Sequence, residues 1–190
     1  MSRVVVIGNA GGGKSTLSRA IATARHLPHI EIDRLLWRPG WQPKPKASYD
    51  AEHAKAIAAE SWLIDGLGRQ DSIAPRIERA TVIVLIDMPI WMHFWLAAER
   101  QIAWVKGAMD HAPGASITMP PTEALFHTMW EVDQHWMPMV RDLCKRAEAQ
   151  HKTLHRLRSV AELTAFTQQF LPAGGTDGAA RHPGHAPPAR

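Results

Sequence analysis

Short apolar segments alternate with longer amphipathic segments along the first 90 residues of the chain. The apolar segments contain β-branched residues and end at acidic or turn-forming residues, which predicts strands. These predicted strands are Arg3 to Ile7, His29 to Asp33, Trp62 to Asp65 and Thr81 to Asp87. Helices are expected between them, and the first runs from Thr16 to His26. Strands that alternate with helices are typical of a parallel sheet with right-handed crossovers and helices on both faces.

The pattern of the second half of the chain predicts mainly helices. Apolar residues recur at steps of four and three between Ile90 and Lys106, which indicates one face of a helix. This face consists of Trp91, Trp95, Ala98, Ile102 and Val105. We expect its two tryptophans to pack in the core or against a lid. A second helical face runs from Leu125 to Trp136, and Pro138 is expected to kink or split that helix.

The remaining segments complete the predicted domain. Lys152 to Leu157 is a plausible fifth strand, and Ser159 with Glu162 fits a capping box at the start of a last helix. The sequence thus predicts one three-layer α/β/α domain over residues 1–171, with about five parallel strands. Residues 107–121 are rich in Pro and Gly and are expected to form a mobile, helical lid insertion. Residues 172–190 have almost nothing to bury and predict a disordered tail.

Composition and charge narrow the class of protein without deciding a function. The 190 residues are 45% hydrophobic and 21% charged, which excludes a wholly disordered chain. The apolar runs are too short to cross a membrane, so no membrane partner is expected. The single cysteine, Cys144, fits a reducing cytoplasm rather than a disulfide framework. A net charge of +4 suits phosphate substrates or nucleic acid and does not decide between them.

The clearest chemical motif lies between the first predicted strand and the first predicted helix. It follows the pattern G-x-x-x-x-G-K-S, in which glycines let backbone N–H groups converge on phosphate oxygens. Lys14 is expected to place a charge on the β- and γ-phosphates, and Ser15 to bind Mg²⁺. The residues predicted to bind ATP are Gly8, Asn9, Ala10, Gly11, Gly12, Gly13, Lys14, Ser15 and Thr16.

Acidic residues close several predicted strands, at the edge where parallel sheets bind their ligands. Asp33 closes the second strand and is expected to orient an acceptor hydroxyl or to hold magnesium through water, although it also suits a helix N-cap. Asp65 closes the third strand, and we expect it to share the magnesium ion with Ser15. Asp87 precedes a turn at Pro89 and is expected to be structural.

Five stretches of the sequence form a set with a family resemblance. They are Gly8 to Ser15, Asp33 to Trp41, Trp62 to Gly66, Arg76 to Ala80 and Leu85 to Pro89. Together they resemble the adenylate-kinase-related P-loop proteins known as DNA topology modulation proteins, over about residues 1 to 171. The block that contains Asp33, Trp37 and Trp41 is what points to this branch. The resemblance implies a small-molecule or nucleotide kinase fold more strongly than a role on DNA.

Resemblance to nucleotide kinases also assigns roles to two arginines. Asp65 to Arg69 resembles the Asp-Gly-x-Pro-Arg element of adenylate kinases, in which the arginine grips the acceptor phosphate, although Gly68 replaces the proline. The alternative is that this arginine faces solvent. Arg100 matches the second of two arginines in the helix after the Asp-x-Pro strand end, and Leu96 stands in place of the first. Beyond the insertion, Arg141 is a candidate to return positive charge to the site.

Trp37 and Trp41 lie in a predicted Pro-rich loop directly after Asp33. Loops carry function more often than core elements do, and a flat acceptor could stack on these side chains as nucleobases stack on aromatic rings. The alternative is that the two indoles are buried to anchor the loop. Both interpretations stay open at this point.

The function that these observations favour is an ATP-dependent phosphotransferase that uses Mg²⁺. Lys14, Arg100 and Arg141 would neutralise charge, and Asp33 would position the acceptor. Arg69 favours an acceptor with a phosphate, such as a nucleotide, whereas Asp33 favours a phosphate-free metabolite with a hydroxyl. The competing function is a nucleotide-dependent regulatory or DNA-interacting ATPase. The family name and the basic charge support it, and the lack of a basic run disfavours nucleic acid as a partner without excluding it.

Overall fold

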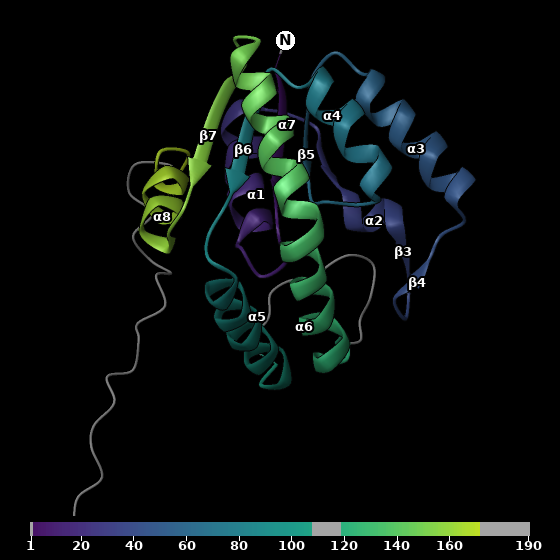
Figure 1. The fold of residues 1–190 in the computed structure, drawn as a ribbon, viewed down its shortest axis with the longest axis vertical. Coiled ribbons are helices and arrows are strands. Elements are labelled where there is room, and N and C mark those ends of the chain that lie inside the picture. The colour runs from purple at the N-terminus through teal and green to yellow at the C-terminus, as the bar shows by residue number, and fades with distance from the viewer. Residues whose placement is uncertain (1, 108–118, 172–190) are drawn as a thin grey trace, which may run out of the picture.

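The computed structural model describes residues 2–107 and 119–171. The expected lid insertion at 107–121 falls almost wholly outside the described residues, and the expected tail at 172–190 falls outside them completely. In the described residues a single parallel sheet lies between two layers of helices (Figure 1).

Five strands form this sheet, and every neighbouring pair in it is parallel. Their order across the sheet is β2-β5-β1-β6-β7. The strands are β1 (Arg3–Gly8), β2 (His29–Glu31), β5 (Trp62–Asp65), β6 (Val82–Ile86) and β7 (Thr153–Leu157). The predicted parallel α/β fold is thereby confirmed. Because β1 occupies the centre, the glycine-rich loop that follows it starts at the middle of the sheet's carboxyl edge.

Helices cover both faces of the sheet, as the alternating pattern predicts (Figure 1). On one face lie α1 (Lys14–Arg25) and α8 (Val160–Gln168), which share an apolar cluster with the strands. The opposite face is covered by α3 (Lys46–Ala58), α4 (Ile73–Arg79) and α7 (Met137–Ala149). The result is the predicted three-layer arrangement.

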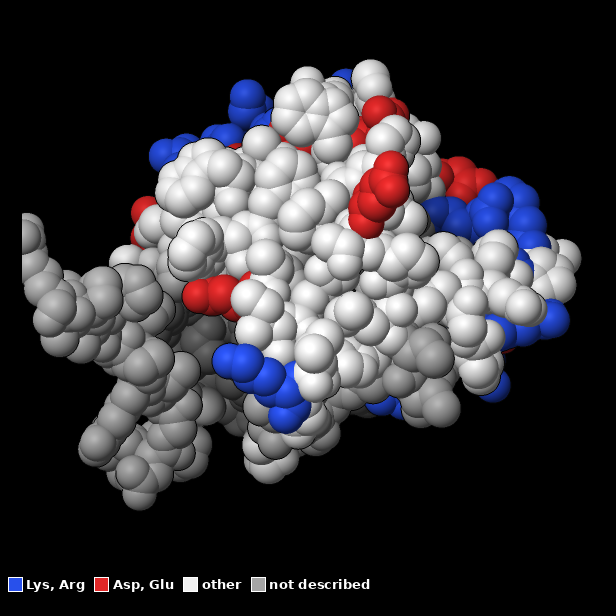
Figure 2. Space-filling model, turned by 90° about the horizontal axis from the view of Figure 1, so that it is seen from below, with Lys and Arg blue, Asp and Glu red and all other residues white. Residues whose placement is uncertain are grey.

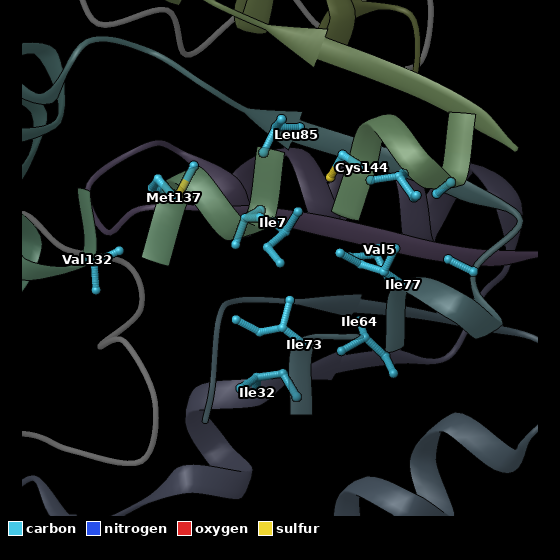
Figure 3. Close-up of a cluster of buried hydrophobic side chains, with 14 of the residues drawn as sticks. Val5, Ile7, Ile32, Ile64, Ile73, Ile77, Leu85, Val132, Met137 and Cys144 are labelled. Carbon is cyan, nitrogen blue, oxygen red and sulfur yellow. The ribbon is translucent and has the colours of Figure 1, made fainter. Parts of the chain in front are cut away.

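Strand β1 shows why its residues form an unbroken apolar run. Val4 and Val6 belong to the cluster beneath α1 and α8, whereas Val5 and Ile7 belong to the cluster on the opposite face. Successive side chains of a strand point to opposite faces, so a strand buried on both faces is apolar at every position. Figure 3 shows the second cluster, in which side chains of the strands meet those of α4 and α7.

Two further helices extend past the carboxyl edge of the sheet (Figure 1). They are α5 (Ile90–Val105) and α6 (Thr122–Glu131). The latter continues through a π-helix, Val132–Trp136, into α7. The break expected near Pro138 therefore takes the form of a π-helical segment, because proline has no N–H to donate to the preceding turn. Within the two described ranges, no helix is long and apolar enough to span a bilayer.

The predicted place of Asp33 at the end of a strand was wrong. Strand β2 ends at Glu31, and Asp33 lies in the first turn of a short helix, α2 (Ile32–Leu36). The N-cap of that helix is Glu31, so Asp33 does not act as the N-cap either. The side chain nevertheless stays at the carboxyl edge of the sheet, because α2 begins directly where β2 ends.

The segment predicted to be a loop after Asp33 contains an antiparallel hairpin. Its strands are β3 (Trp37–Arg38) and β4 (Gln42–Pro43). Between them the chain reverses through positive φ angles of 78° at Gly40 and 59° at Trp41. The hairpin holds both tryptophans of the segment in place, which a loop without backbone pairing would not do.

The predicted buried face of α5 was also wrong, although the helix itself is confirmed. Trp91 and Trp95 are 62% and 61% exposed. The buried residues of α5 are His93, Ala97 and Gln101. Small and polar residues occupy the inner face because this helix lies directly against the backbone of the glycine-rich loop.

Candidate active site

A cavity of about 1920 Å³ opens at the carboxyl edge of the sheet. Single-ligand pockets usually measure about 300–1,000 Å³, so this cavity has room for a nucleotide and a second ligand. All but one of the predicted site residues line it. These residues are Gly8, Asn9, Ala10, Gly11, Gly12, Gly13, Lys14, Ser15, Thr16, Asp33, Trp37, Trp41, Asp65, Arg69 and Arg100.

The glycine-rich loop has the strand–loop–helix setting that phosphate binding requires. Strand β1 ends at Gly8, and α1 begins at Lys14, so the amino end of a 12-residue helix faces the loop. Gly11 adopts a φ of +75°, and a Cβ there would lie 2.5 Å from the carbonyl oxygen of His93. Glycine is therefore required both by the left-handed backbone and by the close approach of α5.

Two buried side chains hold this loop from opposite sides. Asn9 Nδ2 donates to the Met129 carbonyl of α6 at 2.7 Å, and Asn9 Oδ1 accepts from the Ala10 N–H at 2.8 Å. His93 Nδ1 donates to the Ala10 carbonyl at 2.9 Å. Burial lowers the pKa of His93, which keeps the imidazole neutral while that hydrogen bond is made. No role was predicted for His93 from the sequence, in which its only signal is a polar residue inside an apolar helix.

Lys14 lies within the loop that it completes. Its Nζ donates to the Asn9 carbonyl at 2.7 Å. Burial lowers the pKa of Lys14, and the negative charges of Asp33 and Asp65 oppose that shift. A cation enclosed in this way is able to exchange its carbonyl contact for phosphate oxygens.

Asp33 faces the P-loop lysine across the cavity. Asp33 is exposed to the open cavity, and partial desolvation by the surrounding protein raises the pKa of its carboxyl group. The charge of Lys14 opposes the shift, whereas Asp65 adds to it. Burial lowers the pKa of Arg100, and Asp33 opposes that shift in turn. Across the described residues, the three groups act on one another through space and not through a direct ion pair.

Asp65 lies at the end of β5, beside the P-loop. It is 4% exposed, and its Oδ2 accepts a hydrogen bond from His29 Nε2 at 3.3 Å. Ser15 is exposed in the first turn of α1 and lines the same cavity. No cluster of three or more His, Cys, Asp or Glu side chains suited to a metal occurs in the part of the chain that the structure describes.

The cavity wall also contains aromatic side chains and a further cation, Arg69. The rings of Trp37 and Trp41 meet edge to face, with centroids 6.1 Å apart. Arg69 lies on the loop after β5, and buried Arg76 supports that loop by donating to the Gly66 and Leu67 carbonyls at 3.0 and 2.8 Å. Both tryptophans line the cavity, which favours contact with a ligand over a role only in anchoring the loop.

Gly68 departs from the proline of the adenylate kinase element for a local reason. It has a φ of +69°, which proline cannot adopt, and a Cβ there would lie 2.3 Å from the Tyr49 hydroxyl. Tyr49 in turn accepts a hydrogen bond from the Arg69 N–H at 3.3 Å. The turn before Arg69 is therefore packed against α3.

Arg141 is the predicted site residue that does not line the cavity. Its Nε donates to Asp87 Oδ1 at 2.8 Å, and Asp87 also binds Arg156. The Asp87 carboxylate is buried, and it links the end of β6 to β7 and α7, as its expected structural role implies. We leave Arg141 out of the proposed site, because its charge is already engaged by a buried carboxylate.

Many of the residues that line the cavity were not predicted from the sequence as site residues. Among them are Arg19, Glu31, Leu96 and Trp136. Trp136 was assigned to an apolar helix face, and the π-helix that ends at this residue could not be foreseen from the spacing alone. Glu31 had a signal, because it stands two residues before Asp33 and so shares its edge of the sheet.

No family model matches the chain, and no curated protein matches its sequence. Solved structures do share its fold. Shikimate kinase from Acinetobacter baumannii in complex with shikimate has a TM-score of 0.52 at 11% identity, over 89% of this chain and 90% of that chain. A gluconokinase from Sinorhizobium meliloti 1021 has a TM-score of 0.49 at 16% identity, over 88% of this chain and 92% of that chain. The first likeness shows that this chain has the fold of P-loop kinases.

Proposed function

We propose that this protein is an ATP-dependent kinase that phosphorylates a hydroxyl group on a small molecule. The observation that carries the proposal is the grouping of Lys14, Asp33 and Arg100 around one cavity beside a P-loop. The two cations suit the charge of a transferring phosphoryl group. The carboxylate, with its raised pKa, suits acceptance of a proton from an incoming hydroxyl.

In the proposed reaction the acceptor oxygen forms a bond to the γ-phosphorus, while the bond from that phosphorus to the β–γ bridging oxygen breaks. Asp33 accepts the proton of the attacking hydroxyl, and ADP leaves with the bridging oxygen. Lys14, Arg100 and the P-loop N–H groups stabilise the negative charge that develops on the phosphoryl oxygens and on the leaving group.

Ser15 and Asp65 are the residues that we propose to hold a magnesium ion. Both offer oxygen atoms to the wall of the same cavity, and Asp65 also contributes to the charge around Lys14. Magnesium in nucleotide sites usually binds one or two protein groups together with phosphates and water, so two such residues fit. When bound, the ion would neutralise phosphate charge.

The acceptor in this proposal is a hydroxyl-bearing metabolite, with a nucleotide as the second candidate. Asp33 supports the hydroxyl, because a phosphate acceptor has no proton that needs a base of this kind at neutral pH. Arg69 lines the cavity and supports an anionic group elsewhere on the acceptor, as the resemblance to adenylate kinases implies. The Acinetobacter baumannii kinase of the same fold was solved with the small molecule shikimate, which supports a small acceptor.

The sequence block around Asp33, Trp37 and Trp41 supports a relationship to the DNA topology modulation family. The single cysteine supports a cytoplasmic location. A DNA-interacting ATPase is less well supported. Figure 2 views the molecule from below, where α5 and α6 extend past the sheet, and Lys and Arg lie in separate places around its rim. DNA binding usually requires a continuous basic surface.

A screen of ATP consumption tests the proposed function. ADP release would be measured with Mg-ATP and panels of nucleosides, sugars, hydroxy acids and nucleoside monophosphates, with duplex DNA as a separate arm. We expect stimulation by one class of hydroxyl compound. Stimulation by DNA alone, with binding that weakens steeply as salt increases, would support the ATPase instead.

A further inference from the structure

Three tryptophans from two distant parts of the chain line the cavity, at what we term its acceptor end. Trp37 and Trp41 come from the β3–β4 hairpin, and Trp136 comes from the end of the π-helix. All three are half-buried and line the same cavity, so part of each indole remains open to it.

The other tryptophans show that this placement does not follow from composition. The chain has eight tryptophans and one tyrosine. Trp62 is completely buried in the core, whereas Trp91, Trp95 and Trp130 are largely exposed outside the cavity. The cavity tryptophans form a separate group, defined by a concave surface and not by burial.

Trp136 is the last residue of the π-helix between α6 and α7. It follows Val132 by four residues, a spacing that places two side chains on the same side of a helix. Val132 and Trp136, the first and last residues of the segment, both line the cavity. Segments of this kind are rare and often mark functional sites.

We propose that the phosphoryl acceptor carries a flat, unsaturated ring that lies against Trp37, Trp41 and Trp136 while its hydroxyl reaches Asp33. This inference rests on the proposed kinase function. Stacking of a flat ring on an aromatic side chain usually strengthens binding by about 10- to 100-fold.

Matched pairs of compounds test the ring directly. Nucleosides would be compared with ribose, and hydroxymethylpyridines with cyclohexylmethanol, so that a nucleobase and a free heteroaromatic alcohol are distinguished. ADP release measures phosphoryl transfer, and calorimetry with a non-hydrolysable ATP analogue present measures binding without turnover. We expect at least one flat compound to exceed its saturated counterpart by about 10-fold or more in affinity and in kcat/KM.

Three variants link the ring to this wall. Trp136→Leu is expected to raise the KM for the flat acceptor about 10-fold and to leave the KM for ATP within about 2-fold. Trp136→Phe is expected to restore most of the lost affinity, because it keeps an aromatic surface. Trp91→Leu is the matched control, since Trp91 is 62% exposed and lies outside the cavity. Trp37→Leu repeats the test on the hairpin, where no core packing is removed.

The possible failures are distinguishable. If saturated alcohols are phosphorylated as well as flat ones, or if Trp136→Leu and Trp91→Leu behave alike, the ring site is overturned while the kinase stands. If flat compounds bind in a Trp136-dependent way without any ADP release, the ring site stands and the kinase function is overturned. If no flat compound binds or reacts, the inference is wrong.

Discussion

The two ends of the cavity are built in different ways. At the proposed phosphate end, a single run of residues from Gly8 to Thr16 lines the cavity, and in the proposed function its backbone N–H groups would make most of the contacts with phosphate. At the acceptor end, the wall comes from the β3–β4 hairpin, the loop after β5 and the π-helix, which lie far apart in the sequence. Under the proposed function, recognition of phosphate would therefore depend on one local segment, whereas recognition of the acceptor would depend on how distant segments meet.

Asp33 lies between the two ends. Its replacement is expected to give the largest difference between the effect on turnover of the acceptor and the effect on ATP binding. Asp33→Asn keeps the shape of the side chain but loses its charge and its affinity for a proton. We expect turnover to fall by about 10²- to 10⁴-fold, with Mg-ATP affinity nearly intact. Steady-state kinetics with the acceptor and calorimetry with Mg-ATP would measure the two effects. A loss of ATP affinity instead would assign Asp33 to the phosphate end, with the magnesium ion.

Lys14 is expected to matter for the phosphate end alone. Lys14→Ala removes an enclosed cation from the phosphates, and we expect affinity for Mg-ATP to fall by about 30- to 5,000-fold while the protein stays folded. Calorimetric titration measures the loss, and circular dichroism checks the fold. Lys145→Ala is the control, because this lysine is exposed on α7. Equal affinity in the Lys14 variant and the wild type would remove the P-loop from the proposed mechanism.

A buried histidine, His53, is expected to make stability depend on pH. His53 is 5% exposed and stacks on Tyr49, and burial lowers the pKa of His53 to about 4 from 6.5. The unfolded chain therefore binds this proton more readily than the folded protein. The free energy of unfolding is expected to be greatest above pH 6.5 and to fall by about 3 kcal/mol as pH drops to about 4.

Urea titrations at several pH values would show this dependence, and His53→Phe provides the comparison. Phenylalanine keeps a ring against Tyr49 but does not titrate, so the decrease between pH 6.5 and 4 should become smaller in the variant. An unchanged pH profile would mean that other groups cause the acid sensitivity.

At the phosphate end, His93 is expected to produce a smaller effect through the shape of the loop. His93→Ala leaves the Ala10 carbonyl without its donor, which typically costs about 1–3 kcal/mol. We expect weaker Mg-ATP binding with an unchanged KM for the acceptor. His93→Asn offers a side-chain N–H in the same region and is expected to recover part of the affinity. Equal effects on both substrates would indicate a general loss of packing.

The predictions from sequence were most accurate where short-range rules decide the structure. Strands β5 and β6 and helix α8 were located to within a residue or two, and Ser159 caps α8 as expected, accepting from the Glu162 N–H at 3.1 Å. The lining residues from Gly8 to Thr16 were all predicted. Each of these features depends on periodicity, a cap or a turn, which neighbouring residues determine.

The predictions were weaker where one element meets another. The apolar spacing of α5 placed Trp91 inside, but the inner face is occupied by His93 and Ala97. Spacing identifies a helix and its stripes, yet it does not say which stripe a neighbour will cover. Here the neighbour is the P-loop backbone, and a Cβ on Gly11 would already lie 3.2 Å from that of Ala97. Bulky residues are excluded from this contact.

By itself, the sequence determined the parallel α/β fold, the phosphate loop and the acidic edge of the sheet, because each follows from interactions within a few residues. The tertiary structure decided which charges reach the site: Arg141 is engaged by Asp87, whereas Arg100 acts on Asp33. It also decided that Trp136 joins the hairpin tryptophans around one cavity. These outcomes depend on contacts between segments as much as a hundred residues apart, and such contacts exist only once the chain has folded.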